Sequence, residues 1–457
     1  MILNEIDLKQ VIGEMKIVLM APAGAMHRYN GTFSRSLHYA PLTLTTLAAL
    51  VPNELNATIQ LVDETVEKIS LDIEADIIGI TVITGTSVRC YRYADYFRAK
   101  GIFVVLGGVH VSLMPEEAMA HADAIVTGFA EETWPQLLKD FKNNCTQKRY
   151  QQSGKGITLP NLKPRTDLLK KRRYITTNTV EAIRGCHHKC NFCVIPTALN
   201  GQVLNHELNG LIKHIDSLPG KYILFADANL ITDIAFAKAF FKALIPLKKK
   251  WFGLVTSLVI KNEELFNLMI KSGCKGLLIG FESVTNASLS AVNKNFQHET
   301  DYEELVKKLH DNGVAINGTF VFGNDEDDDS VFERTVERIQ KLKIDLPRYS
   351  IYTPFPGTPL YKKLLSENRI IEKDWSAYDV EHCVILPKKM SPEKLQSGLE
   401  WAWHETYKAT NIFSRISGFH SRLLLDLPLN IGYANYGRNL PKFTINKMKD
   451  HSDIPVV

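Results

Sequence analysis

The stretch TVEAIRGCHHKCNFC, residues 179–193, decides the fold of the chain. It begins as a candidate strand and runs directly into a loop that carries three cysteines within eight residues. Helical intervals then alternate with further strands, and the six candidate strands comprise residues 179–184, 222–226, 252–256, 276–281, 316–322 and 348–353. Such β-then-α units predict a partial (β/α)6 TIM-like barrel, which we expect over residues 174–386. Barrels carry their active residues at the carboxyl ends of the strands, so the cysteines lie where the chemistry is expected.

The first 150 residues predict a second α/β unit. Short apolar runs alternate there with helical stretches, and they comprise residues 16–20, 59–62, 76–81, 103–106 and 124–127. This pattern predicts a doubly wound, Rossmann-like parallel sheet over residues 1–150. A polar stretch with several glycines and prolines, residues 151–173, is expected to be a linker.

The C-terminal region, residues 387–457, changes to a helical pattern. Ser391 followed by Pro392 is typical of an N-cap with proline at the first helical position. Leu395, Leu399 and Trp403 then recur at helical spacing. We therefore expect a helical C-terminal segment.

Composition excludes several classes of protein. The 457 residues are 45% hydrophobic and 23% charged, and the net charge of +4 is too small and dispersed to indicate nucleic-acid binding. No apolar run is long enough to span a bilayer, and the N-terminus lacks a basic-then-apolar signal pattern. Seven unevenly spaced cysteines suit metal ligation in a reducing compartment better than a disulfide framework. We expect a cytoplasmic protein without a transmembrane segment.

The three cysteines, Cys186, Cys190 and Cys193, predict a metal site on one loop. Thiolates are the usual ligands of iron–sulphur clusters, and three ligands instead of four leave one iron of a 4Fe–4S cluster open. A structural zinc site with His187 or His188 as fourth ligand is the alternative, although no second CxxC or HxxxH couple exists to complete it. A redox CxxC would leave Cys186 unexplained.

The CxxxCxxC pattern after a first barrel strand, with the aromatic Phe192 before the third cysteine, resembles the radical S-adenosylmethionine (SAM) superfamily. The resemblance implies a 4Fe–4S cluster whose open iron is chelated by the amino and carboxylate groups of SAM. It implies reductive cleavage of SAM to a 5′-deoxyadenosyl radical that abstracts a hydrogen atom from a small-molecule substrate. It also implies an external electron donor such as flavodoxin or ferredoxin.

Four residues at or near strand ends are predicted to contact SAM. Besides Phe192 they are Asp227 after the second strand, Ser257 beside Thr256 after the third, and Glu282 after the fourth. The segment around Asp227 departs from the family's Gly-Gly-Glu motif and resembles the Asp-containing version of the cobalamin-associated branch. Carboxylates at the carboxyl ends of barrel strands are well placed for a site, whereas Thr256 and Ser257 suit capping roles equally well.

The N-terminal unit resembles the cobalamin-binding domain fused to many radical enzymes. Glycines at strand ends let a bulky ligand approach the backbone, and ligands of doubly wound sheets bind at those ends. The predicted cobalamin-binding residues are Thr81, Gly107, Gly108, His110, Gly128 and Glu131. The Asp-x-His-x-x-Gly motif, which supplies a histidine to cobalt in some such domains, is absent. A domain that keeps the fold without the cofactor is an alternative.

The acidic run Asp325–Asp329 has the composition of a metal site, but a solvated loop at a helix N-terminus is the favoured interpretation.

The leading hypothesis is a cobalamin-dependent radical SAM enzyme that methylates an unactivated carbon. An alternative within enzymes is the oxidative cyclisation or rearrangement of a tetrapyrrole-like or isoprenoid-like substrate. From a different class, the chain could be a zinc-stabilised binding protein or an electron carrier.

Overall fold

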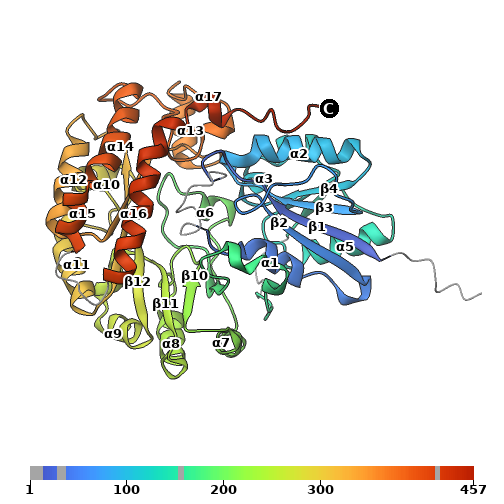
Figure 1. The fold of residues 1–457 in the computed structure, drawn as a ribbon, viewed down its shortest axis with the longest axis horizontal. Coiled ribbons are helices and arrows are strands. Elements are labelled where there is room, and N and C mark those ends of the chain that lie inside the picture. The colour runs from blue at the N-terminus through green and yellow to red at the C-terminus, as the bar shows by residue number, and fades with distance from the viewer. Residues whose placement is uncertain (1–13, 28–37, 153–158, 417–422) are drawn as a thin grey trace, which may run out of the picture.

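Two parallel six-stranded sheets organise the chain, and they lie side by side in the computed structural model (Figure 1). The structure describes residues 14–27, 38–152, 159–416 and 423–457. Residues 1–13, on which the expected absence of a signal peptide rests, lie outside these ranges. None of the helices in the described ranges has the length and apolar character that a membrane crossing requires.

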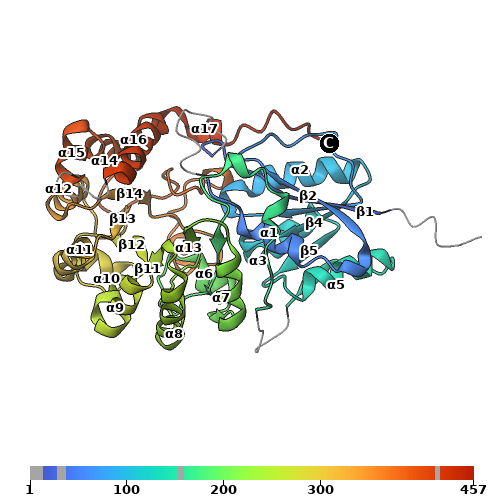
Figure 2. The same ribbon diagram turned by 60° about the horizontal axis from the view of Figure 1, so that its bottom comes forward.

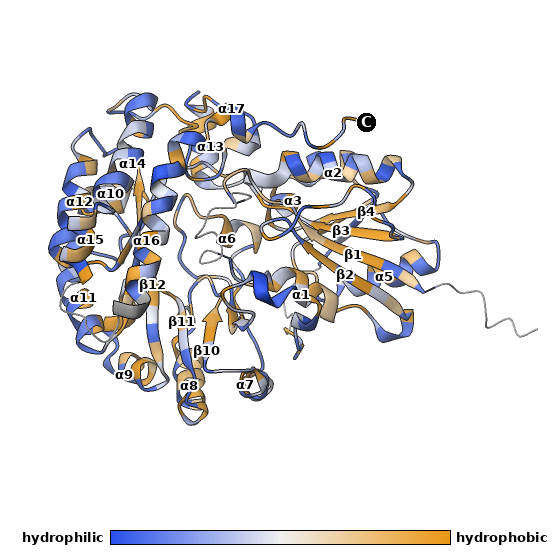
Figure 3. Cartoon of the chain, in the orientation of Figure 1, coloured by the Kyte–Doolittle hydropathy of each residue, from blue (hydrophilic) through white to orange (hydrophobic). Residues whose placement is uncertain are grey.

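The first sheet has the strand order β2-β1-β3-β4-β5-β6, with all its pairings parallel. Its strands are β1 (Met15–Ala21), β2 (Ala57–Asp63), β3 (Ile77–Thr81), β4 (Phe103–Gly107), β5 (Ala124–Thr127) and β6 (Arg149–Gln151). The predicted doubly wound fold is confirmed. The sheet also contains a short edge strand, β6, which the sequence pattern did not predict because it contains no apolar run. Figure 3 shows the central strands as the most hydrophobic part of this half, as expected for strands that are buried on both faces.

Helices cover both faces of this first sheet. The helices of this half are α1 (Leu42–Ala49), α2 (Ser87–Ala99), α3 (Val109–Leu113), α4 (Pro115–Ala120) and α5 (Thr133–Lys142). Side chains of α1 and α5 share one hydrophobic core with the sheet, and those of α2, α3 and α4 share another with its opposite face.

The second sheet has the order β14-β13-β12-β11-β10-β7, again with parallel pairings only. Its strands are β7 (Thr179–Val180), β10 (Tyr222–Phe225), β11 (Lys250–Val255), β12 (Cys274–Glu282), β13 (Ala315–Phe322) and β14 (Leu346–Ile351). These are the six strands predicted for a partial barrel. Between and after them lie the helices α6 (Val194–Ala198), α7 (Leu208–Ser217), α8 (Ile234–Leu244), α9 (Glu263–Lys271), α10 (Asn286–Ala291), α11 (Tyr302–Asp311), α12 (Val331–Leu342) and α13 (Pro359–Ser366).

The first barrel strand is shorter than predicted. It splits into β7 and the separate β8 (Ile183–Arg184), which pairs antiparallel with β9 (Leu204–Asn205). The reason is a side chain: Asp227 accepts hydrogen bonds from the backbone N–H groups of Ala182 and Ile183, which are therefore not available to a strand neighbour.

The C-terminal region is helical, as predicted. Its helices are α14 (Pro392–Thr406), α15 (Ala409–Ile416), α16 (Leu423–Asn439) and α17 (Ile445–Met448). Ser391 caps α14 by accepting a hydrogen bond from the N–H of Lys394. Leu395, Leu399 and Trp403 are buried in the barrel core. Helix α16 packs against α14 and the edge strand β14, and Figure 2 shows these helices grouped on that side of the barrel.

The two halves meet at the carboxyl edges of their sheets. Helix α3, which follows β4, lies against α6, which follows the cysteine loop. Gly357 sits between them: a Cβ there would be 3.1 Å from Leu113 of α3 and 3.5 Å from Thr197 of α6. The C-terminus then returns to the first half, where Ile454 is buried in its core.

The buried guanidinium of Arg89 holds this return through a partly exposed ion pair with Asp453. Arg89 of α2 is 1% exposed and binds Glu64 (Nε–Oε2 2.8 Å) and Asp453 (Nη2–Oδ2 2.7 Å). Tyr93 also donates to Glu64. Arg89 therefore holds the C-terminal segment against the first domain, and its charge is compensated only while these carboxylates stay in place.

We expect Glu64→Gln to destabilise the first domain by about 3 kcal/mol, because it removes a full charge from beside a buried guanidinium. Hydrogen exchange of the β3 amides measures this local stability. Glu74→Gln is the matched control, since the pair of Glu74 with Lys16 is exposed and contributes little. Equal exchange rates in the two variants would contradict the prediction.

Candidate active site

The cysteine loop joins β8 to α6 at the carboxyl edge of the barrel sheet. It starts at Gly185, whose φ is +102° and where a Cβ would lie 2.2 Å from the carbonyl oxygen of Gln202, so only glycine fits. Cys186 and Cys193 are partly exposed, whereas Cys190 is buried, and none of the three forms a disulfide. The loop therefore presents three free thiols on one short segment.

Residues from several strand ends hold this loop. The backbone N–H of His187 donates to Thr232 Oγ1 (3.0 Å), after the second strand of the barrel. The side chain of Asn191 accepts a hydrogen bond from Tyr352 (2.6 Å), after β14, and donates to the carbonyl of Ala291 in α10. The loop conformation is thus set by the barrel and not by local sequence alone.

The thiols suit a metal cluster that displaces their protons. Burial raises the pKa of Cys190 to about 12, and burial also raises the pKa of Cys193. Ligation of Cys190 and Cys193 as thiolates therefore releases protons. Within the described residues, no three His, Cys, Asp or Glu side chains are arranged to bind one metal ion together. Three irons of a 4Fe–4S cluster each take a separate thiolate, which this loop offers.

Asp227 is fully buried at the end of the second strand. Its Oδ1 accepts the N–H groups of Ala182 and Ile183, while Oδ2 is buried without a hydrogen-bond partner among the described residues. Burial raises its pKa well above the usual range. Since buried polar atoms are normally paired, Oδ2 is a candidate contact for a ligand.

The third strand ends in two hydroxyl residues with different surroundings. Ser257 donates to Gln297 Oε1 (3.0 Å), whereas Thr256 Oγ1 is buried and has no hydrogen-bond partner in the described part of the chain. The sequence pattern favours Thr256 and Ser257 equally. The hydroxyl of Thr256 is the one without a hydrogen-bond partner among the described residues. The unpaired atoms of Thr256 and Asp227 fit a ligand that carries both an ammonium group and hydroxyls, as SAM does.

Glu282 ends β12 with φ at +60°, an unusual conformation for this residue. Its carboxylate pairs with Lys294 (2.8 Å), which also donates to the carbonyl of Gly280. The sequence alone does not indicate Lys294, because a single lysine twelve residues after Glu282 belongs to no recognisable motif. Glu282 thus has a cation beside it already.

Phe192, within the cysteine loop, is partly buried against the barrel core. Its ring meets that of Tyr352 edge to face, with centroids 5.9 Å apart. The aromatic pair is next to the cysteines, where Phe192 was predicted to contact SAM.

The predicted cobalamin edge is formed by the ends of β3, β4 and β5. Gly107 ends β4, and Gly108 has φ at +108°; a Cβ at Gly108 would lie 2.7 Å from the carbonyl oxygen of Val82, so glycine is required. Thr81 ends β3, and Gly128 follows β5 with φ at +77°.

Unpaired polar atoms lie along the same edge. Thr127 Oγ1 and both amide atoms of Gln152 are buried without partners among the described residues. Buried polar atoms of this kind fit a large ligand rich in amide groups, such as cobalamin.

Sequence comparison identifies both halves. Residues 180–345 match the radical SAM superfamily, and residues 37–138 match the B12 binding domain. The chain is 30% identical over 417 residues to the bacteriochlorophyllide d C-8(2)-methyltransferase of Chlorobaculum tepidum, covering 86% of this chain and 91% of the relative. The chain belongs to the radical SAM enzymes that carry a B12-binding domain. A second Chlorobaculum tepidum relative, the bacteriochlorophyllide d C-12(1)-methyltransferase, is 29% identical over 398 residues and is covered to 85%, with 83% of this chain matched.

A solved structure shares the whole architecture of this radical SAM enzyme. The cobalamin-dependent SAM radical enzyme OxsB with aqua-cobalamin bound aligns with a TM-score of 0.66 at 13% identity, covering 97% of this chain and 74% of that one. The protein is therefore an enzyme, and its cofactors are a 4Fe–4S cluster, SAM and cobalamin. This membership overturns the alternatives of a zinc-stabilised binding protein and a simple electron carrier. Radical SAM enzymes act on small molecules and need a reductant.

His110 of the radical SAM enzyme is completely buried in α3. Its Nδ1 lies 3.2 Å from Thr84 Oγ1 and its Nε2 lies 3.3 Å from Glu117 Oε1. Glu117 also accepts a hydrogen bond from Trp375 (3.1 Å), which belongs to the barrel half. His110 thus takes part in a network that joins the two domains.

Glu131 lies at the same boundary. Its Oε1 pairs with Arg184 Nη1 (2.5 Å), and Arg184 also binds Glu181 (2.7 Å) immediately before the cysteine loop. Burial acts to raise the pKa of Glu181, but the nearby Arg184 and His206 outweigh this effect and lower that pKa to about 2. Glu131 Oε2 has no partner in the described ranges. The bridge ties the predicted cobalamin edge to the start of the cysteine loop.

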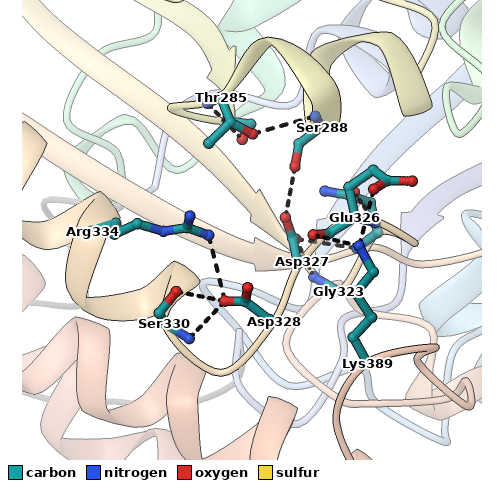
Figure 4. A network of polar contacts seen from close by, with 11 residues as sticks. Thr285, Ser288, Gly323, Glu326, Asp327, Asp328, Ser330, Arg334 and Lys389 are labelled. Carbon is teal, nitrogen blue, oxygen red and sulfur yellow. Dashed lines mark hydrogen bonds and ion pairs between the residues drawn. The ribbon is translucent and has the colours of Figure 1, made fainter.

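The acidic run Asp325–Asp329 has structural roles in the described contacts (Figure 4). Asp327 is buried and accepts hydrogen bonds from Ser288 Oγ (2.8 Å) and the N–H of Gly323 (2.9 Å). Asp328 accepts from the N–H of Ser330 (3.0 Å), which precedes α12. These contacts agree with a loop at a helix N-terminus.

Replacing Cys186, Cys190 or Cys193 by alanine should remove one cluster ligand, so the iron and sulphide bound after anaerobic reconstitution should fall severalfold. Iron and sulphide analysis together with the visible absorption of the cluster measures this. Cys145→Ala is the control, because Cys145 is exposed and lies outside the loop. A full cluster in any of the three variants would refute the assignment of that cysteine.

Asp227→Ala should destabilise the barrel by roughly 2 kcal/mol, because two buried N–H groups beside the cysteine loop lose their acceptor. Asp227→Asn keeps an oxygen in place and should retain most of this stability. Thermal unfolding of the cluster-free protein compares the two variants. Similar stability of Ala and Asn variants would show that the Asp227 contacts do not hold the strand break.

Proposed function

We propose that this radical SAM enzyme methylates an unactivated carbon of a small molecule. The observation that carries the proposal is the meeting of the two carboxyl edges, where α3 of the B12-binding domain lies against α6 behind the cysteine loop. A substrate between these edges would face the sites proposed for both cofactors. When bound, the cluster with SAM supplies an oxidant for hydrogen abstraction and cobalamin supplies a methyl group.

The chain's own residues bind and orient these groups. We assign the cluster to Cys186, Cys190 and Cys193, and we assign the SAM contacts to Asp227 and Thr256. Phe192, Ser257 and Glu282 remain proposed SAM contacts. The Arg184–Glu131 bridge keeps the domains in register, which matters because reacting atoms must be placed within a few tenths of an ångström.

The glycines at the strand ends of the first domain, with Thr81, His110 and Glu131, remain the proposed cobalamin contacts. Gly108 belongs to this edge, where its positive φ and the close backbone of Val82 require glycine. The buried and unpaired side chains of Thr127 and Gln152 extend the proposed contact surface.

The methyltransferases named among the relatives support methyl transfer over other radical reactions. We further propose that a cytoplasmic flavodoxin or ferredoxin supplies the electron. The partly exposed Cys186 and Cys193 are compatible with electron entry at this loop.

Anaerobic turnover with the reconstituted holoenzyme, SAM, a reductant and a bacteriochlorophyllide substrate tests the reaction. We expect one S-adenosylhomocysteine and one 5′-deoxyadenosine for each methyl group found in product by mass spectrometry. Cys186→Ala is the matched control and should form no 5′-deoxyadenosine. Formation of 5′-deoxyadenosine without S-adenosylhomocysteine would contradict methyl transfer and would favour the cyclisation or rearrangement hypothesis.

A further inference from the structure

The inner face of the barrel is not packed like the outer face. Side chains that alternate along a strand point to opposite faces. On β12, β13 and β14 the outward residues Phe281, Phe320 and Tyr349 are fully buried, whereas inward residues such as Thr319 and Arg348 remain partly exposed. A closed barrel fills its interior with side chains, so this one leaves room for a ligand.

Arg348 contributes a cation to this inner face. The strand register pairs it with Thr319, which is itself paired with Gly280, so the three form one row of the wall. Within the described residues, Arg348 has no hydrogen bond and no ion pair; its guanidinium lies 5.8 Å from the ring centre of Tyr433. The carboxylate at the Gly280 end of the row, Glu282, is paired with Lys294, so among the described residues no carboxylate contacts Arg348. A partly hydrated guanidinium inside a barrel is stabilised by an anionic partner, which a ligand would supply.

The groups around Arg348 are polar and incompletely paired. Tyr433 accepts a hydrogen bond from Asn317 Nδ2 (3.1 Å), and Tyr436 donates to Glu381 Oε1 (2.9 Å). Asn317 Oδ1 and Glu381 Oε2 are buried and have no hydrogen-bond partner in the described ranges. A ligand bound near Arg348 would supply hydrogen bonds to these two oxygen atoms as well.

Glu381 lies near Arg348 but forms no ion pair with it among the described contacts. Burial and the nearby charge of Asp379 raise the pKa of Glu381 to about 8, while the charge of Arg348 acts to lower it. The preceding Val380 holds φ at +67°, which is strained for a β-branched residue. The carbonyl oxygen of Val380 accepts a hydrogen bond from the N–H of Ile351, the last residue of β14. This bond fixes the strained loop to β14.

The wall facing this polar corner is apolar. Partly exposed hydrophobic side chains point inward from β10, β11 and β12 of the barrel sheet. These residues are Leu224, Phe252, Leu254 and Leu278. The interior therefore pairs an apolar surface with one cationic corner.

We propose that Arg348 binds a carboxylate of the substrate, and that the substrate is an amphipathic acid with an apolar body. This deepens the proposed function and rests on it. Arg348 lies four residues before Tyr352, which touches the cysteine loop, and four strand residues span about 13 Å. An acid held at Arg348 would thus place its body between the corner and the cluster loop.

Binding of 1-pyrenebutyrate and of its uncharged methyl ester to the reconstituted holoenzyme tests the proposal by equilibrium dialysis. The wild-type enzyme should bind the acid about tenfold more tightly than the ester, as a charge-assisted hydrogen bond implies. Arg348→Gln should weaken acid binding about tenfold and leave ester binding unchanged. Arg348→Lys should recover part of the difference, since it keeps the charge without the bidentate geometry.

Arg338→Gln is the matched control, because Arg338 pairs with Glu303 on the outside of the barrel. Equal binding of acid and ester to the wild type, or no binding of either, would overturn the proposal without any variant. Weaker SAM binding in Arg348→Gln with unchanged acid binding would also overturn it, since the anion would then be that of SAM. The product ratio that tests methyl transfer is independent of these outcomes.

Discussion

The carboxyl group of Asp227 determines where the first barrel strand ends. By accepting two backbone N–H groups at Ala182 and Ile183, it takes them out of the sheet and turns the chain toward β8 and Gly185. The cysteine loop begins at that turn, so Asp227 sets its starting point, while Thr232, Tyr352 and Ala291 hold the rest of the loop. Burial raises the pKa of this carboxyl well above its usual range, and the two N–H donors act in the opposite direction.

The turn also orients Arg184, which links the site to the other domain. Its guanidinium lies between Glu181 of the barrel and Glu131 of the B12-binding domain. The cysteine loop and the cobalamin edge are therefore joined through a residue two positions before the first cysteine. The C-terminal segment adds a second tie at Arg89, remote from the site.

Sequence patterns predict this architecture well where the signal is local. Apolar runs indicate the central strands, and the cysteine spacing marks the loop that we propose as the cluster site. They fail for contacts between distant positions: the strand break depends on Asp227, 44 residues beyond Ile183. Lys294 carries no pattern that pairs it with Glu282, because only the fold brings the two together.

The same limitation hides Arg348, since a single arginine in a strand is indistinguishable from a surface residue until the register is known. The structure shows that its row faces inward and that the buried Glu381, whose pKa is raised by burial and by Asp379, lies nearby. Among the described residues Arg348 has no ion-pair partner, and a cation in that position inside a barrel bears a desolvation cost, to which the strained backbone at Val380 adds. Such costs persist at functional sites because a ligand repays them on binding, which is the physical basis for the substrate contact that we propose at Arg348.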